Sequence, residues 1–237
     1  MSAPHRLPAR RRWTGARVTG WIALSFWVAV ALGAIWMVID GFKPDFFWRY
    51  GPRMLGGFGV TLMLTFTSVL CGAIVALPVA FGRRAKRGLA YVLATAYTSF
   101  FRGTPLLAQT FLVYYGAGQF RESLEAVGLW AFFASPINCA LLTFTLNTAA
   151  YQAEIFRGAV DAVPRGQSEA GMALGLHRGV IFMKLIVPQA MIVALRPFGN
   201  EVILMLKGSA IASVITVFDL MGETKLAFAR SFDFQVY

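Results

Sequence analysis

Four charged side chains lie inside otherwise apolar stretches of this 237-residue chain. They are Arg102, Glu154, Arg196 and Glu201. A charge in such a stretch raises the free energy of membrane insertion and is therefore a candidate for a functional role. Glu201 follows Asn200, and a carboxylate beside an amide can replace the water around an ammonium or guanidinium group. We therefore predict that Asn200, Glu201 and Arg102 line a path for a cation of that kind.

A structural role is the alternative for these charges. Arg102 or Arg196 could instead pair with Glu201 and hold two helices together. Glu154 stands near the end of its apolar stretch, where we expect an ion pair with Arg157 or Arg165.

The sequence offers no pattern for catalysis, a metal or a bound nucleotide. A GxxxxGK[ST] phosphate-binding motif is absent. His5 and His177 are far apart and have no cysteines at zinc-site spacing. Cys71 and Cys139 fall in apolar stretches, where we expect them to be small buried residues. We predict no catalytic residue, cofactor site or metal site in this chain.

The composition indicates an integral membrane protein, since 57% of the residues are hydrophobic, 14% are charged and the mean hydropathy is +0.62. A net charge of +11 would suit a nucleic-acid-binding protein, but the basic residues stand at the ends of apolar stretches. We therefore expect a lipid bilayer as partner, and no nucleic acid.

The fold class follows from the apolar stretches that are long enough to cross a hydrocarbon core of about 30 Å. The predicted spans are residues 18–39, 58–81, 89–118, 130–153 and 185–206. Residues 211–220 are too short to cross. We predict an all-α, polytopic membrane protein.

Residues 29–31 could alternatively end a cleaved signal peptide, although the apolar run continues to residue 39 and favours a retained helix.

The orientation follows from basic residues, which gather before the first span, after the second and after the fourth, in residues 1–17, 83–87 and 157–184. By the positive-inside rule these segments are cytoplasmic. The polar loop at residues 154–184 is therefore predicted to face the cytoplasm.

This loop contains Glu169 and Ala170, followed by Gly175. Pro164 and Gly175 predict the start and end of a short helix along the membrane surface, with Arg165 and Glu169 one turn apart on one face. The alternative is that glycine and proline merely punctuate helices, and that Glu169 pairs with Arg165 or Arg178 on a solvated face.

Several motifs together resemble the polar amino-acid permeases of ABC importers. They are FRGTPL at residues 101–106, LNTAAYQAE at 146–154, EAG at 169–171 in the place of the EAA loop, and NEVILML at 200–206. The resemblance is greatest to the histidine, lysine-arginine-ornithine and opine importers, in particular to the M-type member of a pair of unlike permease subunits.

This resemblance implies a type I importer (MetI-like) helix bundle over residues 51–237. Residues 18–39 would then be an extra N-terminal span, and the final span of the family is expected to be missing after residue 237. The subunit would be a multi-pass protein of the bacterial inner membrane. It would have no enzymatic activity of its own and would import histidine, arginine, lysine, ornithine or related amino acids by alternating access.

The resemblance also implies partners. Two ATPase subunits would carry ATP and Mg²⁺, and a periplasmic or extracellular binding protein would deliver the substrate. A second permease subunit would complete a heterodimer, with a homodimer as the alternative. Contact with the ATPase is expected at Gly166, Glu169, Ala170 and Gly175. The family has alanine where this chain has Gly171, which lowers helix propensity by about 1 kcal/mol and predicts an effect on coupling.

Three alternatives remain open at this stage. An opine permease of the same class would be distinguished by uptake competition. A proton-coupled secondary transporter would use Glu154 or Glu201 as proton carrier and would need no ATPase. A scaffold or channel would tolerate changes at Gly166 or Glu169.

Overall fold

The computed structural model describes residues 15–41, 44–85, 87–233 and 236, and the regular elements in these ranges are all helices. This confirms the predicted all-α class. Most of the basic N-terminal segment predicted at residues 1–17 lies outside the described residues. The chain divides between Arg49 and Tyr50 into two compact units.

The first unit contains helix α1, Gly15–Gly41, which includes the predicted span at residues 18–39. Its described side chains are exposed along the span, Trp21 and Trp36 among them. A helix that is apolar all round needs lipid or another chain around it. Helix α1 therefore has the properties of a membrane helix.

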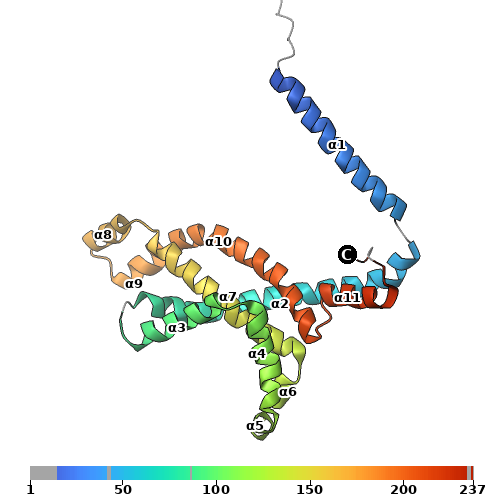
Figure 1. Ribbon diagram of the computed structural model, residues 1–237. Helices are drawn as coiled ribbons and strands as arrows, with labels where there is room; N and C mark the ends of the chain where they lie inside the picture. The colour runs from blue at the N-terminus through green and yellow to red at the C-terminus, as the bar shows by residue number, and fades with distance from the viewer. Residues whose placement is uncertain (1–14, 42–43, 86, 234–235, 237) are drawn as a thin grey trace, which may run out of the picture. The chain divides into compact units, whose positions relative to one another are not determined.

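The second unit is built around helix α7, Pro136–Asp161 (Figure 1). Helix α10, Val187–Gly208, packs along it, as do α3, Leu89–Gly103, and α4, Leu106–Gln119. Helix α2, Pro44–Arg84, contributes Leu64 and Val69 to the same core.

Small residues let α2 and α7 approach closely. A Cβ atom added at Gly72 of α2 would lie 2.6 Å from Cγ2 of Thr148 on α7. Ala76, Ala80, Ala149 and Ala153 form an adjoining buried cluster. Close packing of this kind is the usual basis of helix association in membranes.

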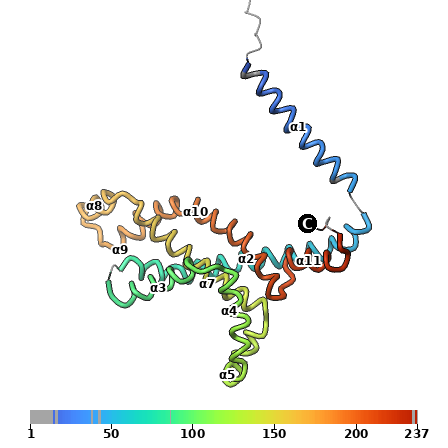
Figure 2. The backbone as a smooth tube through the Cα atoms, in the orientation of Figure 1, coloured from blue at the N-terminus to red at the C-terminus, as the bar shows by residue number. Residues whose placement is uncertain are grey.

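The span predicted at residues 89–118 is wrong as a single helix, because it breaks at Thr104 and Pro105 into α3 and α4. Pro105 has no N–H to donate and disfavours the helical conformation at Thr104, which is extended. The span predicted from residue 130 also starts later, at Pro136. Two short helices precede it, α5 at Arg121–Ala126 and α6 at Trp130–Phe133, and together with α4 they project from the side of the unit (Figure 2).

Short helices occupy the two ends of the second unit. Helices α8, Arg165–Ala173, and α9, Arg178–Val180, lie at one end, and the π-helix η1, Ile181–Ile186, leads from them into α10. The 3-10 helix η2, Ser209–Ile215, and α11, Leu220–Ser231, lie toward the other end.

Within the described ranges, three segments are both long and apolar enough to cross a membrane. They are Val18–Gly41, Pro44–Arg84 and Arg178–Ile215. Helices α3 and α4 are not among these segments, because the break at Pro105 leaves each of them too short.

Candidate functional site

Helix α8 is the short helix predicted between Pro164 and Gly175, and the structure confirms it as Arg165–Ala173. Pro164 precedes its first residue with an extended backbone. Gly175 follows its end with a φ of 72°, a left-handed conformation that glycine adopts without strain. The sequence thus fixes both ends of the helix.

One face of α8 is open. Gly166, Glu169 and Ala170 are exposed, and so is Gly175 just beyond the helix. A Cβ atom added at Gly166 would meet nothing within 4 Å. Among the residues that the structure describes, Glu169 forms no ion pair, so the alternative pairing with Arg165 or Arg178 is not observed. This face is free for a partner.

The opposite face of α8 packs on η1. Gly171 is buried, and a Cβ atom added there would lie 2.8 Å from Cγ1 of Ile181 and 3.2 Å from Cδ1 of Leu185. The glycine at this position therefore serves close packing, a role that helix propensity alone did not indicate. Because η1 continues into α10, helix α8 packs on a segment that is continuous with a long helix of the bundle.

An ionic cluster ties α7 to α2 near the same end of the unit. Glu154 accepts from Arg83 at 2.6 Å and pairs with Arg157 at 2.9 Å, and Arg157 also pairs with Asp161 at 2.9 Å. The predicted pair of Glu154 with Arg157 is confirmed. Arg83 was missed, because nothing in the sequence links two residues 71 positions apart.

A buried polar network lies inside the bundle. Thr148 Oγ1 on α7 donates to Glu201 Oε1 on α10 at 2.8 Å. Gln152 Nε2 donates to Thr148 Oγ1 at 3.1 Å and to the Val69 carbonyl of α2 at 3.0 Å. Three helices thus share one network, which joins the buried Glu201 carboxylate to α7 and, through Gln152, to α2. Polar residues four apart in LNTAAYQ were the signal that could have predicted it.

The three residues predicted to line a path are not joined to one another. Glu201 is buried, whereas Asn200 is exposed on the same helix. Arg102, at the end of α3, has its guanidinium 5.3 Å from the centre of the Tyr151 ring. No ion pair links Glu201 to Arg102 or Arg196 in the described part of the chain.

A second cluster of polar side chains forms hydrogen bonds at the break between α3 and α4. The Phe101 carbonyl accepts from Gln109 Nε2 at 2.9 Å and from Asn147 Nδ2 at 3.1 Å. Gln109 Nε2 also donates to the Thr104 carbonyl at 3.1 Å. These side chains replace the backbone hydrogen bonds that Pro105 interrupts. Sequence reasoning missed Gln109, although a proline in a span predicts that some donor must compensate.

Most of the sequence matches the profile of one known protein family. The profile of the family described as binding-protein-dependent transport system inner membrane component matches residues 52–235. The chain belongs to this family. The predicted resemblance is therefore confirmed. The matched residues include α8, the buried network and the α3–α4 break.

Curated relatives of this inner membrane component are permease proteins. The chain is 44% identical to the nopaline transport system permease protein NocM of Agrobacterium fabrum, over 73% of this chain and 72% of the relative. It is 41% identical to the octopine transport system permease protein OccM of Rhizobium meliloti, over 76% and 74% of the two chains. The arginine ABC transporter permease protein ArtM of Haemophilus influenzae is 37% identical, over 79% and 82%.

Solved structures agree with the fold. A crystal structure of an amino acid ABC transporter with histidines matches with a TM-score of 0.71 and 33% identity, over 83% of this chain and 88% of that one. The MetNI methionine ABC transporter in an inward-facing conformation matches with a TM-score of 0.63 and 20% identity, over 82% and 87%. The second likeness shows the fold alone, which is the predicted MetI-like bundle.

Proposed function

We propose that this inner membrane component is the permease subunit of a bacterial ABC importer for polar or basic amino acids or opines, working by alternating access. The names of its relatives supply the substrate class, because they concern arginine, octopine and nopaline. Each of these solutes carries a guanidinium group. The protein would be multi-pass in the inner membrane.

The main support for this proposal is that one face of α8 is exposed while the opposite face packs on η1. One face presents Gly166, Glu169 and Ala170 without a partner among the described residues, and the other is packed on η1 through Gly171. An ATPase subunit that bound the open face would displace η1 and α10 with it. ATP binding can drive such a change only if it favours one conformation of the assembly over the other.

The proposed assembly contains further subunits. Two ATPase subunits bind ATP and Mg²⁺, and a periplasmic or extracellular binding protein delivers the substrate. A second permease subunit completes the pathway, either an unlike one or a second copy of this chain. In this assembly Glu201, Asn200 and Arg102 contact the substrate during its passage. Support comes from the buried carboxylate of Glu201, which has one hydrogen-bond donor in the described residues.

Co-purification tests the ATPase contact. The tagged chain is isolated in mild detergent beside Glu169→Lys and a matched control, Glu122→Lys, whose exposed carboxylate lies on α5. We expect the ATPase with the parent and with the control, and its loss from Glu169→Lys, because a lysine reverses the charge at the open face. Loss from neither variant would contradict the proposed contact.

An opine is the second candidate substrate, favoured by the 44% identity to the nopaline permease protein. Uptake of labelled arginine by cells carrying the complete importer is measured with unlabelled histidine, arginine, octopine or nopaline as competitor. Competition by the opines at lower concentration than by arginine would assign the opine function. The reverse order would assign a basic amino acid.

A further inference from the structure

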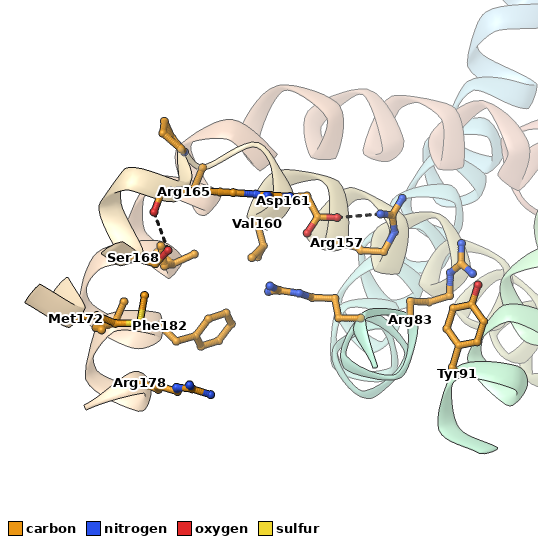
Figure 3. A pocket seen from close by; sticks show the side chains of 15 residues that line it. Arg83, Tyr91, Arg157, Val160, Asp161, Arg165, Ser168, Met172, Arg178 and Phe182 are labelled. Carbon is orange, nitrogen blue, oxygen red and sulfur yellow. Dashed lines mark hydrogen bonds and ion pairs between the residues drawn. The ribbon is translucent and has the colours of Figure 1, made fainter. Parts of the chain in front are cut away.

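A large basic cavity lies between α8 and the bundle. Its volume is about 1160 Å³, and its walls come from α2, α3, α7, α8, α9 and η1. Its lining includes five arginines and one aspartate, as Figure 3 shows for most of them. These residues are Arg83, Arg84, Arg157, Arg165, Arg178 and Asp161. The cavity is built from separate parts of the chain, and so exists only in the folded protein.

The positive charge of this cavity is not balanced within the described chain. Arg83 and Arg157 are held by Glu154 and Asp161. Arg84, Arg165 and Arg178 form no ion pair with any residue that the structure describes. Three unpaired guanidinium groups around one cavity favour an anion with several acceptor oxygens, such as a phosphate.

An apolar groove adjoins the cavity. Its volume is about 460 Å³, and its walls come from α2, α7, η1 and α10. Arg84, Arg157, Val160 and Phe182 line both the groove and the basic cavity, so the two lie side by side. The Arg84 guanidinium lies 5.7 Å from the centre of the Phe182 ring, at the junction. A ligand here would meet cationic groups at one end and hydrocarbon side chains at the other.

We propose that the cavity and groove together bind one anionic phospholipid of the cytoplasmic leaflet. Its phosphate contacts Arg84 and Arg178, and one acyl chain lies in the groove. The positive-inside rule places these arginines at the cytoplasmic surface, where basic pockets between membrane helices attract anionic headgroups. The site is additional to the proposed transport function, since it uses neither Glu169 nor the buried network.

Photolabelling of the assembled importer tests this site. The complete complex is placed in nanodiscs with phosphatidylglycerol that carries a diazirine in one acyl chain, and labelled peptides are mapped. We expect labelling at residues 73–81 and 183–191, which line the groove. Phosphatidylcholine with the same diazirine should label these peptides far less, and this comparison needs no substitution. Equal labelling by the two lipids would overturn the proposal.

Substitutions sharpen the test. Removing two charges with Arg84→Gln and Arg178→Gln should lower phosphatidylglycerol labelling roughly 30-fold, whereas lysine at both positions should retain most of it. Arg121→Gln, on α5 and away from the cavity, is the matched control and should label as the parent does. Unchanged labelling in the double glutamine variant would contradict the site.

Two further outcomes would also overturn the proposal. Inorganic phosphate that abolished labelling would show an anion site that does not need the lipid. Absence of label from the groove in the complete complex would show that a partner protein covers it.

Discussion

Glu201 is a buried carboxylate on α10, a helix that packs along α7 in the core of the second unit. Its carboxylate is buried and accepts a hydrogen bond from Thr148 at 2.8 Å. A buried charge with so little compensation is costly to the fold and is typical of functional positions in membrane proteins. The proposed contact of Glu201 with the substrate would account for a carboxylate at this position.

A double-mutant cycle tests this reading of Glu201. Thr148→Val removes the donor at nearly constant shape and should lower the free energy of unfolding by about 1–3 kcal/mol, because it leaves a buried carboxylate without that hydrogen bond. In a Glu201→Gln background the same change should cost less than half as much. Thermal unfolding in detergent measures both. Equal losses in the two backgrounds would show that Thr148 acts by packing alone.

Among the elements, α2 and α7 depend on a glycine for their contact. Gly72→Leu should lower the free energy of unfolding by about 3 kcal/mol, because even a Cβ atom there would meet Thr148 at 2.6 Å. Gly59→Leu on the same helix is the control, since a Cβ atom at Gly59 meets nothing within 4 Å. Chemical unfolding monitored by circular dichroism compares the two. Similar midpoints would argue against close packing at Gly72.

A glycine also permits the contact between α8 and η1. Gly171→Val should separate them, because Ile181 Cγ1 lies 2.8 Å from the position of the added Cβ atom. We expect amide exchange across residues 165–173 to become about tenfold faster or more. Gly166→Val, on the open face, serves as the control and should leave exchange slow. Equal rates in the two variants would mean that α8 is not held by η1.

For the whole molecule, the long apolar stretches were predictable because hydrophobic length alone specifies them. Residues 18–39 and 58–81 fall inside α1 and α2. The ends of α8 were also predictable, since Pro164 and Gly175 act locally. Residues 89–118 were wrongly predicted as one helix, although Pro105 was visible, because the compensating donors Gln109 and Asn147 come from other positions in the fold.

The candidate site was predictable only in part, for the same physical reason. Glu154 with Arg157 is a contact between neighbours on one helix, and it was expected. Glu154 with Arg83, and Glu201 with Thr148, depend on how distant helices pack. The packing role of Gly171 likewise becomes visible only when Ile181 is placed beside it.

The proposed contact between the open face of α8 and an ATPase can be tested directly by crosslinking. A photo-crosslinking amino acid is placed at residue 170 on this face and, as control, at residue 122 on α5, and the complete importer is irradiated in its native membrane. We expect a covalent adduct between the chain and the ATPase from position 170 and none from position 122. An importer that transports normally yet gives no such adduct from position 170 would contradict the proposed contact.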